Sequence, residues 1–203
     1  MTTELVLIRH GQVEKAGSTA VGGNLNPPLS ELGHNSAGQI ARRLGRENTY
    51  SALYTSPLIR ATQTADAISK TTGLNPVVVE SFREWDFTRS MNSFDRFRLW
   101  VYVTMSRFNP FKHNLSKMWA TSPNLKEFIQ TISVELEKII ERHKNQKVII
   151  VAHGGTIDAI LTHYFPMEGE WERGVIRNCS LTRIAINENK AKLLDFNDCN
   201  HLQ

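Results

Sequence analysis

Short apolar runs along the chain predict four β-strands, at residues 4–9, 52–56, 76–79 and 148–152. The apolar residues of the first run are consecutive and end near the turn-prone Gly11, which is typical of a central strand buried on both faces. Near the C-terminus, the segments 180–186 and 190–196 flank Glu188 and Asn189 and predict an antiparallel hairpin.

Helical patterns fill the intervals between these strands. Two Ser-Pro pairs, Ser56-Pro57 and Ser122-Pro123, predict helix starts, because serine caps a helix and proline is tolerated at its first position. The first of these helices is expected to run to about Thr72, where Gly73 ends it. The second carries an apolar stripe at helical spacing, formed by Leu125, Phe128, Ile132, Leu136, Ile139 and Ile140. Two more helices are expected, one following Ser30 and one running from about residue 154 to Tyr164.

The alternation of strands and helices predicts an α/β fold: a three-layer sandwich with a mostly parallel central sheet and helices on both faces. With 203 residues, 40% hydrophobic and 22% charged, the chain can bury one core. We therefore expect a single domain over 1–203, interrupted by a helical cap insertion at about 85–121.

Composition also restricts where the protein works. The longest apolar runs are five or six residues, whereas a bilayer span requires roughly 18 to 20, so we expect no membrane span. The N-terminus lacks the basic stretch followed by an apolar stretch that forms an export signal, which favours a cytoplasmic location. The two cysteines, Cys179 and Cys199, make neither a disulfide framework nor a spaced metal site.

Two histidines stand at the ends of predicted strands. His10 and His153 each follow an apolar run and precede a glycine. Because ligands collect at the carboxyl ends of parallel strands, the pair is expected at one edge of the sheet, together with the adjacent Arg9. Arg60 lies near the start of a helix, whose free N–H groups attract anions. A single histidine in such a place is more often structural, but the repeated pattern beside two arginines predicts an anion site.

Five segments containing these residues occur in a specific order along the chain: LVLIRHG (5–11), PLSELG (28–33), YTSPLIRATQTA (54–65), FREWDF (82–87) and VIIVAHGG (148–155). In order and spacing they resemble the histidine phosphatase superfamily, also called the phosphoglycerate mutase-like family. The resemblance extends from the first strand to about residue 187. It implies a phosphoglycerate mutase-like fold.

The resemblance also implies a role for each candidate residue. His10 would be the nucleophile and form a transient phosphohistidine, which divides one displacement into two easier steps. Arg9, Arg60 and His153 would surround the phosphoryl oxygens, and Glu84 would be the general acid. No metal and no cofactor is expected. The substrate-binding residues are expected to be Gly11, Gln12, Asn26 and Gly154.

The chain departs from the family pattern in the loop that follows the first strand. The family usually has a hydroxyl residue and then an asparagine there, whereas this chain has Val13 and no asparagine at the expected place. Asn26, or the backbone of Gly22 and Gly23, is expected to supply the missing phosphate contact. The chain departs from the family pattern a second time, in the segment that follows residues 86–88.

The segment that follows, 83–117, holds seven basic and three acidic side chains and eight aromatic ones, a local excess of +4. Two interpretations stay open: a helical cap whose aromatic residues pack onto the sheet, or a lid that selects a bulky anionic substrate with an aromatic or apolar part. Nucleic-acid binding is not expected, because no nucleic-acid-binding motif accompanies the basic residues.

The leading hypothesis is a cofactor-independent phosphatase that hydrolyses a small-molecule phosphomonoester through phospho-His10. One alternative is phosphoryl transfer of the phosphoglycerate mutase type, and another is a non-catalytic phosphoester-binding protein. The mainly small and neutral loop 16–26 favours hydrolysis, since the family's mutases carry more polar and basic residues there. The sequence leaves open both the identity of the phosphorylated substrate and whether the protein forms an oligomer.

Overall fold

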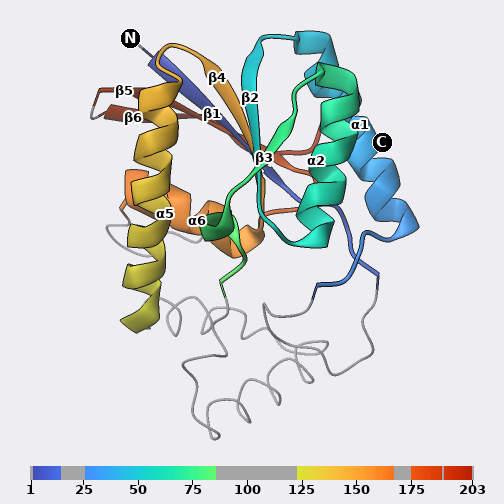
Figure 1. Ribbon diagram of the computed structural model, residues 1–203, viewed down its shortest axis with the longest axis horizontal. Coiled ribbons are helices and arrows are strands. Elements are labelled where there is room, and N and C mark those ends of the chain that lie inside the picture. The colour runs from blue at the N-terminus through green and yellow to red at the C-terminus, as the bar shows by residue number, and fades with distance from the viewer. Residues whose placement is uncertain (1, 15–25, 86–122, 167–174, 189, 203) are drawn as a thin grey trace, which may run out of the picture.

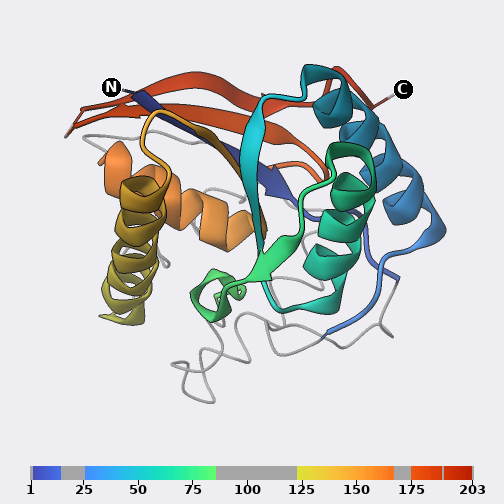
Figure 2. The same ribbon diagram turned by 45° about the horizontal axis from the view of Figure 1, so that its top comes forward.

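One six-stranded sheet forms the centre of the computed structural model, which describes residues 2–14, 26–85, 123–166, 175–188 and 190–202. The strands are β1 (Thr2–Arg9), β2 (Tyr50–Thr55), β3 (Pro76–Val78), β4 (Lys147–Ala152), β5 (Leu181–Asn187) and β6 (Lys190–Asp198). Their order across the sheet is β3-β2-β4-β1-β5-β6. The strands β3, β2, β4 and β1 pair in parallel, and the predicted hairpin β5–β6 adds to β1 in antiparallel fashion. In Figure 2 this hairpin runs along the sheet beside β1.

Helices cover both faces of the sheet, which confirms the predicted three-layer α/β architecture (Figure 1). The described helices are α1 (Glu31–Glu47), α2 (Ile59–Thr72), α5 (Pro123–Arg142), α6 (Gly154–Tyr164) and the short 3₁₀ helix η1 (Glu80–Phe82). Figure 1 shows α1 and α2 grouped on one side of the sheet and α5 and α6 on the other. None of the helices in the described part of the chain is long and apolar enough to cross a membrane.

The sheet separates two apolar cores, and β1 contributes to both. Its residues Leu5 and Leu7 pack with α5 and α6, whereas Val6 and Ile8 pack with α1 and α2. All four side chains are fully buried, as the consecutive apolar run predicts for a strand covered on both faces. At about 1.5 to 3 kcal/mol for each large apolar side chain removed from water, this burial fixes the central strand that leads to His10.

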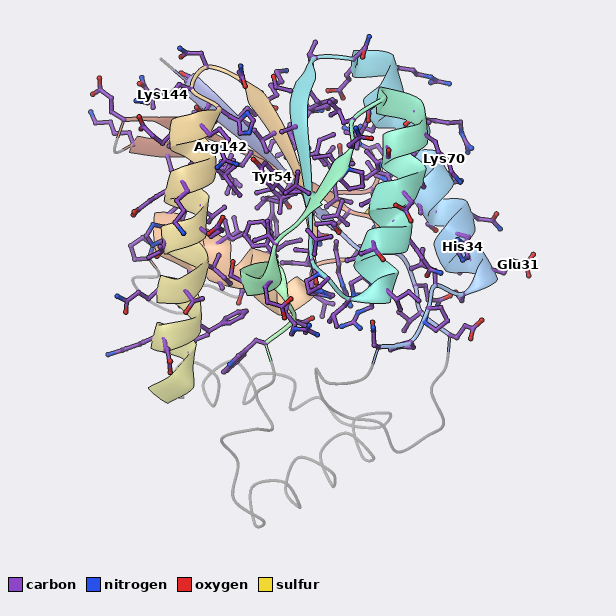
Figure 3. All side chains as sticks on the ribbon, in the orientation of Figure 1. Glu31, His34, Tyr54, Lys70, Arg142 and Lys144 are labelled. Carbon is purple, nitrogen blue, oxygen red and sulfur yellow. The ribbon has the colours of Figure 1, made fainter. Side chains whose placement is uncertain are left out.

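A polar contact at the edge of the core that packs with α5 and α6 joins the sheet to the residue that follows α5. The Tyr54 side chain points from β2 toward α5 in Figure 3, and its hydroxyl lies 2.9 Å from Nε2 of His143, just beyond the end of that helix. On the opposite side of the molecule, Glu31 and His34 project outward from α1 into solvent (Figure 3). The helix α1 begins as expected after Ser30, whose hydroxyl caps the N–H of Gly33.

The prediction that a helix begins at the Ser56-Pro57 pair is wrong, because α2 begins at Ile59. Ser56 instead continues the strand pairing, with its N–H donated to the carbonyl of Val151 at 3.0 Å. The free N–H of Ile59 is capped from outside the helix by Oδ1 of Asn26, at 2.7 Å. A tertiary partner therefore replaces the local cap that the Ser-Pro pattern predicts. The end of α2 agrees with expectation, since Gly73 follows in a left-handed conformation with φ of 73°.

The expected cap insertion at about 85–121 lies almost wholly outside the described residues, as does the expected helix cap Ser122. The single-domain assignment, the lid interpretation and the loop glycines Gly22 and Gly23 stay predictions for the same reason.

Candidate active site

The two strand-end histidines lie side by side. The strands β1 and β4 are neighbours in the sheet and Arg9 is in register with Ala152, so His10 and His153 leave adjacent strands at the same edge. The N–H of His10 donates to the carbonyl of Ala152 at 3.0 Å. Their ring centroids are 5.0 Å apart, and both side chains are buried. Residues separated by 143 positions are thus brought into one site.

Hydrogen bonds fix the protonation of the His10 ring. Its Nδ1 lies 2.7 Å from the carbonyl oxygen of Gly11, which can only accept, so Nδ1 carries the proton. Its Nε2 accepts a hydrogen bond from Nε of Arg60 at 3.2 Å. Both contacts require the same tautomer, with the lone pair on Nε2 facing the guanidinium group. That atom is free to act as a nucleophile toward an electrophile that displaces Arg60 from it.

Burial keeps His10 neutral. Removal of the ring from water, followed by repulsion from the Arg9 guanidinium and then that of Arg60, lowers the pKa of His10 to about 3. The pKa of His153 is also lowered, well below its ordinary value, first by burial and then by His10, Arg60, Arg9 and Arg83. The site therefore contains two neutral imidazoles between two cations.

Two buried nitrogen atoms of the site have no hydrogen-bond partner among the described residues: Nε of Arg9 and Nδ1 of His153. The Arg9 guanidinium is held from its other side, where Nη1 donates to the carbonyl of Ile176. Leaving buried donors unsatisfied costs free energy, about 1 to 3 kcal/mol each and more when the donor is charged. An unsatisfied guanidinium N–H and an unsatisfied imidazole nitrogen beside a neutral His10 are the arrangement expected for a site that binds an anion.

The carboxyl group of Glu84 lies beside the ring of His153. Its Oε1 accepts hydrogen bonds from the backbone N–H of Trp85 at 3.2 Å and of Gly155 at 3.1 Å, while Oε2 lies 4.0 Å from Nδ1 of His153. A Cβ on Gly155 would lie 2.6 Å from Oε1, so only glycine permits this approach. Burial raises the pKa of Glu84, although Arg60, Arg9 and the two N–H groups oppose the rise. The arrangement favours a protonated carboxyl with Oε2 as the exchanging oxygen.

The remaining predicted residues differ in their positions. Gly11 is required by close packing, because a Cβ there would lie 2.6 Å from the carbonyl oxygen of Gly33 in α1. Gly154 opens α6 beside Arg9, as expected for an anion-binding helix start. The Gln12 side chain is exposed and contacts Ser30, and the side-chain oxygen of Asn26 caps α2. Gly154 therefore lies beside Arg9, whereas the contacts of Gly11, Gln12 and Asn26 are structural, and the substrate-binding roles of all four stay predictions.

Three residues outside the expected catalytic and substrate-binding set also lie at the site, one of them Ser56 at a strand end where the sequence places ligands. Ser56 is fully buried and places its hydroxyl 2.7 Å from Nε2 of His153. Asn178 donates from Nδ2 to the carbonyl of His10 at 2.9 Å, and Thr64 accepts the N–H of Gly11 at 3.1 Å. Ser56 carried a signal, namely a polar residue directly after an apolar strand, but the following proline favoured its interpretation as a helix cap.

No group of three histidine, cysteine or acidic side chains within the described ranges is placed to hold a metal ion. Cys179 is fully buried behind the site, and burial raises the pKa of its thiol to about 12. It is therefore protonated at neutral pH.

Comparison with known proteins agrees with this geometry. The family model described as Histidine phosphatase superfamily (branch 1) matches residues 5–199, so the similarity continues past residue 187 through β6. The chain is 30% identical over 206 residues to a putative phosphoserine phosphatase 2 of Hydrogenobacter thermophilus, covering 97% of this chain and 96% of that protein. It is 28% identical over 205 residues to a metal-independent phosphoserine phosphatase of Arabidopsis thaliana, covering 98% and 83%. Among solved structures, YhfR of Bacillus stearothermophilus has the same fold, with a TM-score of 0.76 at 22% identity, covering 99% of this chain and 100% of that one. The chain belongs to the histidine phosphatase superfamily, branch 1.

Proposed function

We propose that this protein is a phosphatase that hydrolyses a small-molecule phosphomonoester through a phosphohistidine on His10, without a cofactor. The observation that carries the proposal is the pair of buried, unpartnered nitrogen atoms, Nε of Arg9 and Nδ1 of His153, beside the lone pair of His10 Nε2. Donors in that position would hold the phosphoryl oxygens and place phosphorus in front of the nucleophile.

In the first step, the lone pair of His10 Nε2 attacks phosphorus while the bond to the leaving oxygen breaks. The proton of Nδ1 stays hydrogen-bonded to Gly11, and the ring becomes an N-phosphorylated cation. Glu84 gives its proton from Oε2 to the leaving oxygen, so that an alcohol departs and a carboxylate remains. Arg9 and Arg60 stabilise the negative charge that develops on the phosphoryl oxygens.

In the second step, the Glu84 carboxylate takes a proton from water, and the oxygen of that water forms a bond to phosphorus. The P–N bond breaks, its electron pair returns to Nε2, and inorganic phosphate leaves. Glu84 is again protonated and His10 again neutral. Two fixed N–H donors on Oε1 leave Oε2 to carry the proton in both steps.

The relatives suggest which substrate class to test first. Two curated relatives at 28% and 30% identity are described as phosphoserine phosphatases, one of them as a putative one. A phosphorylated amino or hydroxy acid presents an alkoxide leaving group, which a protonated Glu84 suits. Phosphoserine is therefore the first substrate in a screen of phosphorylated metabolites ranked by kcat/KM.

Trapping the intermediate tests the proposal directly. Rapid acid-free quenching with ³²P-labelled substrate is expected to label His10, and the label is expected to be released as inorganic phosphate with water alone. Release only when a glycerate or sugar acceptor is added would replace the phosphatase assignment by a mutase-type transfer. Binding of the phosphoester with neither label nor product would replace it by a non-catalytic binding protein.

The dependence of kcat/KM on pH is expected to reflect the protonation of Glu84 more than that of His10. His10 must be neutral to attack, and with its pKa lowered to about 3 it loses this form only in strong acid. Glu84 must be protonated, so kcat/KM is expected to fall as pH rises through its raised pKa. We expect an optimum at mildly acidic to neutral pH in a profile of kcat/KM measured at constant ionic strength. An optimum above about pH 9 would contradict the general-acid role of Glu84.

A further inference from the structure

Ser56 stands directly behind His153, at the end of β2. Its side chain is fully buried, and its backbone N–H is held by the carbonyl of Val151 at 3.0 Å, which fixes its position relative to β4. Its hydroxyl oxygen lies 2.7 Å from Nε2 of His153, whose ring is also fully buried. Two buried polar groups at this distance share one proton along a defined hydrogen bond.

The direction of that hydrogen bond follows from the other partners. Ser56 Oγ already accepts the backbone N–H of Leu58 at 3.3 Å. Within the described part of the chain, the acceptor recorded near the hydroxyl proton is Nε2 of His153. A hydroxyl that donates to Nε2 requires a lone pair on that nitrogen, so the proton of the neutral ring lies on Nδ1. The opposite tautomer would leave the hydroxyl proton without that acceptor.

The consequence appears at the far side of the ring. Nδ1 of His153 is buried, has no hydrogen-bond partner in the described ranges, and lies 4.0 Å from Oε2 of Glu84. With a proton on Nδ1, the ring offers a donor toward Glu84 and the cleft beside His10. Without it, the ring would turn a lone pair toward the oxygens of any incoming phosphoryl group, which is repulsive.

We propose that Ser56 is a positioning residue whose hydroxyl fixes His153 in the Nδ1–H tautomer, so that a neutral imidazole presents an N–H donor to the transferring phosphoryl group. The inference rests on the proposed function for its catalytic consequence, whereas the tautomer is a property of the unliganded protein. The hydroxyl acts only through His153.

Nitrogen NMR of the full-length protein with ¹⁵N-labelled histidine reads the tautomer. The signals of His153 are assigned by their disappearance in the His153→Asn variant. In the unsubstituted protein at neutral pH, Nδ1 is expected to give the shift of a protonated ring nitrogen and Nε2 that of an unprotonated one. In Ser56→Ala this pattern is expected to be lost, with the two shifts moving toward an average. A proton on Nε2 in the unsubstituted protein overturns the proposal, as does an unchanged pattern in Ser56→Ala.

Kinetics with p-nitrophenyl phosphate test the consequence. Because removal of one preorganised donor from an active site typically costs about 10²- to 10³-fold in kcat, partial loss of the Nδ1–H form in Ser56→Ala is expected to lower kcat by roughly 10- to 100-fold, with little change in KM. Inhibition by vanadate should weaken by a similar factor. An unchanged kcat alongside a shifted tautomer would overturn the catalytic part of the proposal.

Thr55→Val supplies the matched control. Thr55 is the last residue of β2 and immediately precedes Ser56; it is also buried, and it directs its hydroxyl to the carbonyl of Ser56 at 3.2 Å instead of to a histidine ring. This variant should leave both the His153 shifts and kcat unchanged, and an equal effect in both variants would show that Ser56 acts through packing alone. If the protein hydrolysed no phosphomonoester, the proposed function would fail, while the NMR measurement would still decide the tautomer.

Discussion

Replacement of His10 by alanine is expected to lower kcat for p-nitrophenyl phosphate by about 10⁴-fold or more, because the variant has no nitrogen to accept the phosphoryl group. Water would then have to attack directly, helped only by the cations. The anion donors Arg9 and His153 do not depend on the imidazole, so binding of inorganic phosphate measured by calorimetry should persist. No ³²P label should remain on the protein.

The control for this variant is His34→Ala. His34 is an exposed histidine on α1, on the outer side of the helix, so its loss should change kcat less than about twofold. Thermal unfolding followed by circular dichroism establishes that both variants are folded. Undiminished turnover in folded His10→Ala would remove the phosphohistidine mechanism altogether.

The burial of His10 also explains how one set of charges serves two purposes. Desolvation and the guanidinium groups of Arg9 and Arg60 suppress protonation of the ring, and a protonated ring could not attack phosphorus. The same two guanidinium groups stabilise the negative charge of the phosphoryl oxygens in the transition state. In the unliganded protein, Nε of Arg60 donates a hydrogen bond to the lone pair of His10 Nε2 at 3.2 Å, and a substrate oxygen would compete for that guanidinium group.

The fold followed from patterns that are local in the sequence. A strand buried on both faces must be apolar at consecutive positions, and Leu5 to Ile8 are indeed fully buried. The convergence of strand ends follows from the rule for parallel sheets, so the placement of His10 and His153 at one edge was predictable, whereas the order that makes β1 and β4 neighbours was not. The start of α2 was not predictable in this way, because Asn26 caps the helix from a distant segment of the chain.

The contacts of the site that the sequence does not predict share a physical cause. Ser56 and Asn178 contact their partners through hydrogen bonds that span 97 and 168 positions of sequence. Local propensity favours serine and asparagine in caps and turns for reasons unconnected with such contacts. The left-handed conformation of Cys179, with φ of 52°, likewise follows from the tight turn at which its N–H reaches the carbonyl of Arg9. Tertiary packing alone determines these features.

Replacement of Glu84 by glutamine is expected to lower kcat for an alkyl phosphomonoester such as phosphoserine by about 10²- to 10⁴-fold, because an amide cannot give a proton to the leaving alkoxide. The amide oxygen can still accept the N–H groups of Trp85 and Gly155, so the side chain should keep its position. With p-nitrophenyl phosphate the loss should be smaller, since a nitrophenolate leaves without protonation. The alkaline decline of kcat/KM should disappear, because the group that titrates is gone.

Glu80→Gln is the matched control, four residues earlier in the same segment. The Glu80 side chain is 73% exposed and pairs only with the partly exposed Arg83 among the described residues, so its substitution should preserve both kcat and the pH profile. The difference between substrates is the decisive measurement. A structural defect in Glu84→Gln would lower both rates equally, whereas loss of a proton donor lowers the rate in proportion to the basicity of the leaving oxygen. Equal losses for the alkyl and the nitrophenyl ester would therefore show that Glu84 positions the site without protonating the leaving group.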